Sequence, residues 1–215
     1  MKPRIIYEDR QIIVCHKPAG IPVQTSRVSV PDMVSLLKNH LAASQRSSAS
    51  SRNPAAGHNP AAGRSSSASR NPSSGAPYLA VIHRLDQPVS GLLVFGKTKK
   101  SASSLNAQLT GGSFGKHYRA LVDRCPPNPS GTLQDYLVKD GRSNTSRVCS
   151  PDTPGAKKAV LEYRTVSGES SFFPDAKEGQ TELEIHLLTG RHHQIRVQLA
   201  HLGCPLAGDT KYNPS

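Results

Sequence analysis

The chain has 215 residues, of which 35% are hydrophobic and 27 are Lys or Arg against 15 Asp and Glu, giving a formal net charge of +12. A chain of this length can bury one core, and the low apolar share predicts a segment outside that core. The charge favours a polyanionic partner, with nucleic acid first. The sequence has no apolar run long enough to cross a bilayer and no secretory leader pattern, so we expect a cytoplasmic protein with no membrane partner. Its cysteines are not paired at a close spacing, so we expect neither a zinc ribbon nor a disulfide framework.

The first half of the chain predicts a strand and a helix before a polar segment. Residues 12–15 form a short apolar run that ends at a Lys-Pro-Ala-Gly turn, as a strand does. Asp32 is placed to cap a helix over residues 33–41, where apolar residues recur at helical spacing. Residues 43–77 are rich in Ser, Ala, Asn, Pro and Gly, with arginines and no acidic residue. We expect a flexible cationic loop there. The favoured interpretation is a tolerated surface insertion, and the alternative is a segment that contacts RNA phosphates.

The second half predicts strands with isolated helices between them. A helix that contains Ala102, Leu105 and Leu109 ends at a Gly-Gly pair, and a second helix covers residues 191–202 with His192 and Arg196 on its flank. The expected strands are residues 91–95, as a buried strand, 117–122, 158–166 and 182–187. This order favours an α+β fold over a doubly wound sheet.

Two charged segments are candidate functional sites. Residues 83–91 (HRLDQPVSG) form a loop beside a buried strand, where rigid scaffolds present reactive groups. Residues 190–196 (GRHHQIR) are a basic, amide-rich helix start. Taken alone, Asp86 could simply cap a turn or pair with Arg84. Adjacent histidines on a helix would point away from each other, so we expect no metal site at His192 and His193.

These two charged segments, in their order along the chain, resemble the signature motifs of RluA-type pseudouridine synthases. Residues 14–20 (VCHKPAG), 116–122 (KHYRALV) and 203–212 (GCPLAGDTKY) are similar to further motifs of that family. The resemblance covers nearly the whole chain apart from the polar segment. It implies an α+β fold around a mixed, largely antiparallel sheet, with a few flanking helices and a central basic cleft, formed by residues 1–215 as a single catalytic domain.

The resemblance also implies an activity and its residues. The protein would isomerise uridine to pseudouridine in ribosomal or transfer RNA, as a monomer, with no cofactor and no metal. The catalytic residues would be Asp86, Tyr118 and Arg196. Asp86 would act as an ionised carboxylate, by nucleophilic attack or by taking a proton from the ribose, and this choice stays open. Arg196 would pair with Asp86 and keep it charged, and Tyr118 would stack on the extruded uracil.

RNA contacts are expected from six further residues: Arg84, His83, Arg191, His193, Gln194 and Lys116. Arg84 could also take the place of the extruded uridine in the stack.

The sequence departs from the family pattern at a few positions. Val89 stands where the family usually has Thr, and His16 stands where it usually has Asn. The family generally continues with further core strands after the segment of Asp209, so we expect a shortened or remodelled C-terminus. An inactive RNA-binding pseudo-enzyme of the same fold is therefore the alternative, although all three motif residues remain in the sequence.

Overall fold

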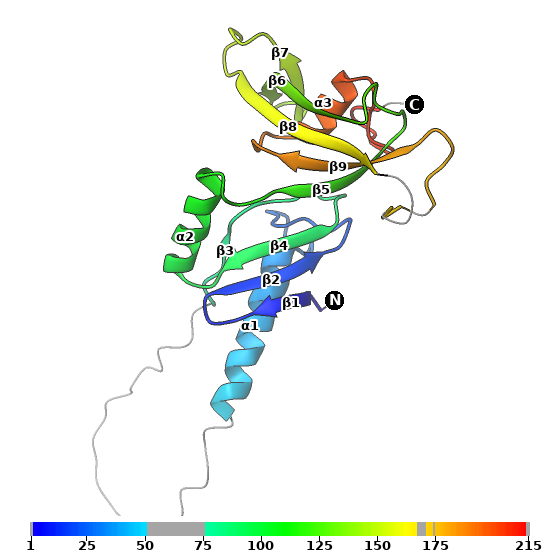
Figure 1. The fold of residues 1–215 in the computed structure, drawn as a ribbon. Helices are drawn as coiled ribbons and strands as arrows, with labels where there is room; N and C mark the ends of the chain where they lie inside the picture. Colours follow the sequence, from blue (N-terminus) through cyan, green and yellow to red (C-terminus); the bar gives the residue numbers. More distant parts are fainter. Residues whose placement is uncertain (1, 51–75, 167–170, 174, 214–215) are drawn as a thin grey trace, which may run out of the picture. The chain divides into compact units, whose positions relative to one another are not determined.

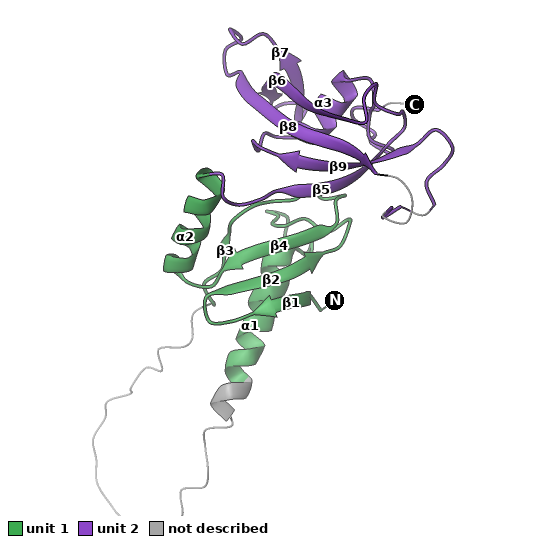
Figure 2. Ribbon diagram, viewed as in Figure 1, with its two compact units in different colours: residues 1–111 green, residues 112–215 purple. Residues whose placement is uncertain are grey.

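We describe a computed structural model of the chain, over residues 2–50, 76–166, 171–173 and 175–213. Its helices and strands are drawn in Figure 1. The chain divides into two compact units, Met1–Gly111 and Gly112–Ser215 (Figure 2). That residues 1–215 act as a single catalytic domain stays a prediction.

The first unit is built on an antiparallel sheet with the strand order β1-β2-β4-β3. The strands are β1 (Arg4–Glu8), β2 (Ile12–Lys17), β3 (Ala80–Val81) and β4 (Gly91–Gly96). Alternate residues of β4 point to opposite faces, so Leu93 and Phe95 are buried while Leu92 is 57% exposed. The predicted strand at β4 is therefore confirmed, but it is buried on one face only.

Helix α1 (Met33–Ser50) lies across the buried face of this sheet (Figure 1). Met33, Val34 and Leu37 form one apolar stripe that packs on β2 and β4. Asp32 caps the helix as predicted, because its Oδ1 accepts the N–H of Ser35 at 2.7 Å.

The helix is longer than predicted. No Gly or Pro interrupts residues 33–50, and Ala, Gln and Arg favour a helix, so residues 43–50 are not the expected loop. Residues 51–75 of that predicted loop lie outside the described residues.

Helix α2 (Lys99–Thr110) follows β4 directly, and its C-terminal cap is Gly111, as predicted. Thr98 and Ser101 form a capping box, in which each side chain accepts the backbone N–H of the other. The Ser101 hydroxyl also donates to the carbonyl of Gln11 at 2.7 Å, which ties the helix start to the turn before β2.

The second unit is an antiparallel sheet with the order β5-β9-β8-β6-β7, followed by one helix. Its elements are β5 (His117–Val122), β6 (Ser130–Asp140), β7 (Thr145–Cys149), β8 (Lys157–Val166), β9 (Thr181–Leu187) and α3 (Gln194–His201). The predictions at β5, β8 and β9 are confirmed. β6 and β7 were not predicted, because their polar residues give only a weak two-residue alternation.

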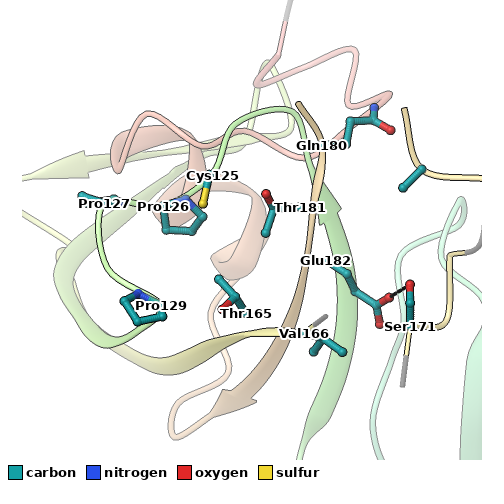
Figure 3. Close-up of a pocket in the computed structure, with 11 residues that line it drawn as sticks. Cys125, Pro126, Pro127, Pro129, Thr165, Val166, Ser171, Gln180, Thr181 and Glu182 are labelled. Carbon is teal, nitrogen blue, oxygen red and sulfur yellow. Dashed lines mark hydrogen bonds between the residues drawn. The ribbon is translucent and has the colours of Figure 1, made fainter. Parts of the chain in front are cut away.

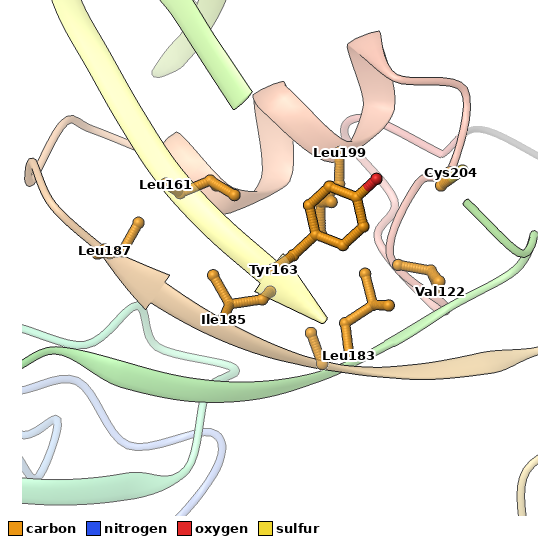
Figure 4. Packing of buried hydrophobic residues seen from close by; sticks show 9 residues of the cluster. Val122, Leu161, Tyr163, Leu183, Ile185, Leu187, Leu199 and Cys204 are labelled. Atoms are coloured by element: carbon orange, nitrogen blue, oxygen red, sulfur yellow. The ribbon is translucent and has the colours of Figure 1, made fainter. Parts of the chain in front are cut away.

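Helix α3 covers one face of this sheet, as Figure 4 shows for Leu199 above the buried side chains of β8 and β9. The cluster there comprises Ala120, Val122, Leu161, Tyr163, Leu183, Ile185, Leu187, Leu199 and Cys204. The first unit has its own cluster between α1, β2 and β4. Each sheet therefore buries apolar residues in a cluster of its own, and the expectation of one core stays a prediction. Antiparallel sheets with separate helices confirm the predicted α+β class.

In the part of the chain that the structure describes, no helix is both long and apolar enough to cross a membrane.

Candidate active site

The loop that carries Asp86 is held by the turn that follows β2. The N–H of Gly20 donates to the carbonyl of Gln87 at 2.9 Å, and Nε2 of Gln87 donates to the carbonyl of Gly20 at 2.9 Å. Gly20 has a φ of +85°, in the left-handed region that favours glycine. Nζ of Lys17 adds hydrogen bonds to the carbonyls of Gln87 at 2.9 Å and Pro18 at 3.1 Å. Asp86 therefore sits on a backbone that is fixed from the side of β2.

Lys17 is fully buried, which is unusual for a lysine. Burial lowers its pKa, and the negative charge of Asp86 acts in the opposite direction and favours the protonated ammonium. A buried cation thus attracts the predicted catalytic carboxylate. Lys17 was not predicted as a site residue, although it continues the inward-facing series of Ile13 and Cys15 at a spacing of two.

His83 anchors the same loop to β4. The backbone N–H of Val94 donates to its Nε2 at 3.3 Å, so this ring nitrogen carries no proton. Burial lowers the pKa of His83, which also favours the neutral ring. The geometry therefore supports a structural role rather than the predicted RNA contact. Its neighbour Arg84 is exposed, as an RNA contact requires.

In the second unit, Arg196 on α3 is held by the carboxylate of Asp209, which was not predicted as a site residue. Its Nε donates to Oδ2 of Asp209 at 2.7 Å and its Nη2 donates to Oδ1 at 2.6 Å. The guanidinium carbon lies 5.0 Å from the centre of the Tyr212 ring. Burial alone would raise the pKa of Asp209, but hydrogen bonds from Arg196 and from backbone N–H groups outweigh it and hold the pKa below its ordinary value.

Two histidines precede α3 and stack on each other. The helix begins at Gln194 rather than at residue 191, and His193 has a φ of +54°, outside helical geometry. The rings of His192 and His193 therefore stack with centroids 3.8 Å apart, and the expectation that they point away from each other is wrong. Nδ1 of His193 shares a hydrogen bond with the Tyr212 hydroxyl at 2.8 Å, and Nδ1 of His192 bonds the Ser146 hydroxyl at 2.9 Å.

Gln194 is a buried hydrogen-bonding centre. Its Oε1 accepts the Thr189 hydroxyl at 2.8 Å and the Arg191 N–H at 2.9 Å. Its Nε2 donates to the carbonyl of Val160 at 3.1 Å and to Oε1 of Gln198 at 3.0 Å. The predicted RNA contact of Gln194 receives no support, because all four hydrogen-bonding positions of the amide face the protein.

Lys116 and Arg191 form a pair of neighbouring cations. Burial and then the charge of Arg191 lower the pKa of Lys116. A Cβ atom built on Gly190 would lie 3.5 Å from Nζ of Lys116, so the ammonium lies against the turn before Arg191. Nε of Arg191 donates to the carbonyl of Lys158 at 2.8 Å, which fixes the guanidinium. Among the described residues, neither cation forms an ion pair with a carboxylate.

Tyr118 lies on β5 and is half-buried, with its ring packed against the core below α3. It shares the inward face of the strand with Ala120 and Val122. Stacking of Tyr118 on a uracil stays a prediction.

A pocket of about 560 Å³ in the second unit contains none of the predicted site residues (Figure 3). Its lining includes Cys125, three prolines and the buried Glu182, whose carboxylate accepts the Ser171 hydroxyl at 2.7 Å. A buried carboxylate beside prolines offers nothing that attracts an RNA phosphate, so we do not assign the pocket to this site.

The predicted catalytic residues belong to different units, with Asp86 in the first and both Tyr118 and Arg196 in the second. The pairing of Arg196 with Asp86 and the basic cleft therefore stay predictions. Within the second unit, the structure gives Arg196 the partner Asp209.

A family model described as RNA pseudouridylate synthase matches residues 11–201. The chain is 32% identical to "RNA pseudouridine synthase 4, mitochondrial" of Arabidopsis thaliana, over 97% of this chain and 40% of that protein. It is 30% identical to "Ribosomal large subunit pseudouridine synthase D" of Pseudomonas aeruginosa, over 97% of this chain and 52% of the relative. It is 30% identical to "tRNA pseudouridine(32) synthase, mitochondrial" of Saccharomyces cerevisiae, over 98% of this chain and 37% of the relative.

Among solved structures, human RNA Pseudouridylate Synthase Domain Containing 4 is similar with a TM-score of 0.67 and 22% identity. The alignment covers 98% of this chain and 69% of the human chain. This likeness supports the fold. The chain spans only about 40% of the length of the Arabidopsis relative.

Proposed function

The chain belongs to the RNA pseudouridylate synthase family, and from this premise we propose that it isomerises uridine to pseudouridine in RNA, with Asp86 as the catalytic carboxylate. The family match and the relatives named ribosomal large subunit pseudouridine synthase D confirm the resemblance to RluA-type enzymes. The observation that carries the proposal is the fixed loop of Asp86, which is bonded to the turn after β2 and lies near the buried ammonium of Lys17.

The reaction suits a carboxylate without a redox group. The bond from N1 of uracil to the ribose breaks, the uracil turns while it is held, and C5 forms a bond to the same sugar carbon. C5 then loses its proton, and N1 takes one up. Asp86 acts either as the nucleophile at the sugar or as the base that removes a ribose proton, and both routes need its ionised form. The charge of Asp86 favours the protonated form of Lys17, so a cation lies near this carboxylate. Tyr118 stacks on the extruded uracil, and Arg196 is the third proposed catalytic residue.

RNA phosphates are bound by cations that form no ion pair with a carboxylate among the residues that the structure describes. Lys116 and Arg191 are held side by side and are the strongest candidates, and the exposed Arg84 is the third. Two like charges this close are costly unless an anion joins them, and a phosphate meets that need. His193 also contributes to RNA binding, and its hydrogen bond with the Tyr212 hydroxyl orients its ring.

The proposed substrate is ribosomal or transfer RNA, since relatives are named for both. We propose a monomer in the cytoplasm, while two relatives are named as mitochondrial proteins. An inactive RNA-binding pseudo-enzyme is not favoured, because Asp86, Tyr118 and Arg196 are all present.

The decisive test is Asp86→Asn, which removes the negative charge and keeps the size of the side chain. We expect pseudouridine formation on ribosomal and transfer RNA transcripts to fall to background, because either route needs an ionised carboxylate. RNA affinity, measured by fluorescence anisotropy, should stay the same or rise slightly as one negative charge is lost.

The matched control is Asp152→Asn at an exposed position, which should leave turnover unchanged. Substantial activity in the Asp86 variant would remove the catalytic assignment. An inactive parent protein that still binds RNA would favour the pseudo-enzyme.

A further inference from the structure

Arg196 is held along one edge of its guanidinium by Asp209. The two hydrogen bonds, Nε to Oδ2 at 2.7 Å and Nη2 to Oδ1 at 2.6 Å, run in parallel. Only 16% of the Arg196 side chain and 4% of the Asp209 side chain are exposed, so solvent screens the pair weakly. A bidentate pair of this kind fixes both the plane and the direction of the guanidinium.

Asp209 is itself fixed by its own turn. Its Oδ1 also accepts the N–H of Lys211 at 3.0 Å and that of Tyr212 at 3.3 Å. The preceding Gly208 has a φ of +73°, which lets the chain turn back at this point. These bonds surround the carboxylate with donors, and its burial keeps it from any substrate.

Tyr212 completes the support from the same turn. Its hydroxyl accepts the N–H of Ser146 at 2.8 Å, which ties the ring to β7. The ring then faces the guanidinium of Arg196, 5.0 Å from its carbon, where a cation is attracted to the aromatic face. Asp209 and Tyr212 of one turn thus both contact the guanidinium that α3 carries.

We propose that Asp209 is a positioning residue of the isomerisation, which acts through Arg196 by fixing the direction of the N–H groups that Asp209 does not bind. This inference rests on the proposed function. A long arginine side chain has many rotamers, and their restriction before the reaction reduces the entropy cost of reaching the reactive geometry. Asp209 touches neither the RNA nor the reacting atoms.

The same unit offers a matched control pair. Glu182 is a carboxylate with 3% of its side chain exposed, and it accepts a hydrogen bond from Nη1 of Arg119 at 2.9 Å. Arg119 is bound there through a single nitrogen and is 34% exposed. Loss of the Glu182 charge should therefore lower stability without changing the direction of a catalytic group.

The test is a double-mutant cycle on single-turnover rates with saturating enzyme, at a temperature where all variants are folded by circular dichroism. We expect Asp209→Asn to lower the rate about tenfold or more while the RNA dissociation constant changes less than about threefold. In an Arg196→Gln background, the same substitution should lower the residual rate less than about twofold, because the guanidinium that Asp209 positions is already absent. Glu182→Gln should keep the parent rate within about twofold.

Should Asp209→Asn fail to fold, Asp209→Glu carries the test, because it keeps the charge and displaces the guanidinium by one methylene group. The inference would be overturned if the Asp209 variant reacted as fast as the parent protein. It would also be overturned if the Asp209 substitution lowered the rate by the same factor in the Arg196→Gln background as in the parent. If Glu182→Gln slowed the reaction as much as Asp209→Asn, the effect would belong to stability and the inference would fall. An inactive parent protein would instead contradict the proposed function itself.

Discussion

Lys17 is the residue whose environment is most at odds with its chemistry. Its ammonium is fully buried and bonded to two carbonyls, one of them next to Asp86 in the chain. We expect Lys17→Met to keep the length of the side chain, to lose both hydrogen bonds, and to destabilise the protein by about 1–3 kcal/mol. Both carbonyls would lose the ammonium as a donor, and the Asp86 loop would keep only its hydrogen bonds with Gly20 on this side. Pseudouridine formation should fall more than RNA affinity.

The free energy of unfolding from urea titrations and a turnover assay check this prediction. Lys100→Met on the exposed surface of α2 is the control and should change neither quantity. A stable Lys17→Met variant with parent activity would show that the loop is held without the lysine.

Glu182 predicts how stability depends on pH. Burial raises its pKa, but hydrogen bonds from Ser171, from the N–H of Phe172 and from Arg119 outweigh burial and leave the pKa below its ordinary value. A folded-state pKa below the unfolded value stabilises the folded protein above the unfolded pKa. That stabilisation is lost as the pH falls through the folded pKa. Glu182→Gln should therefore lower the free energy of unfolding by about 1–3 kcal/mol at neutral pH and by less in acid.

Urea titrations at neutral pH and at several acidic pH values measure this difference. Glu178→Gln at an exposed position should lose no comparable stability at any of them. A difference between parent and Glu182→Gln that stayed constant down to the most acidic pH would contradict the assigned pKa direction.

At the scale of elements, the contact between β4 and α2 depends on Gly96. A Cβ atom at this position would lie 2.9 Å from the backbone nitrogen of Ala102 and 3.0 Å from its Cα. Because these atoms belong to the helix backbone, they cannot move aside as a side-chain end does. We expect Gly96→Ala to destabilise the protein by about 1–3 kcal/mol through overpacking.

Thermal unfolding with Gly141→Ala as the control checks the contact. A Cβ at Gly141 meets nothing within 4 Å, so that variant should be neutral or slightly stabilised. Equal melting temperatures for Gly96→Ala and the parent would mean that α2 can shift on the sheet at little cost.

At the scale of the whole molecule, the net charge of +12 predicts RNA binding that weakens steeply with salt. Each phosphate contact releases counterions, so the logarithm of the association constant should fall linearly with the logarithm of salt concentration. If Lys116 and Arg191 each contact a phosphate, Lys116→Gln and Arg191→Gln should each reduce the magnitude of that slope by about 1.

Anisotropy titrations over a series of salt concentrations measure the slopes. Lys97→Gln is the control, because Lys97 already pairs with Glu8 at 2.7 Å. Unchanged slopes in both cation variants would place the phosphate contacts elsewhere on the protein.

The sequence by itself determined several local elements and the family. The cap at Asp32, the end of α2 at Gly111 and the two-residue alternation of β9 depend on neighbours within a few positions, and all of them were predicted. The motifs around Asp86, Tyr118 and Arg196 led to the RluA-type family for the same reason, since each is a short contiguous segment.

Only the tertiary structure decided which groups meet. Nζ of Lys17 bonds a carbonyl 70 positions away, and the Tyr212 hydroxyl accepts an N–H 66 positions away. Within the second unit Asp209 proved to be a partner of Arg196, and the stacked histidines followed from the start of α3 at Gln194. Such contacts depend on how strands and turns are brought together, and no periodicity along the chain encodes the distance between two side chains that are far apart in sequence.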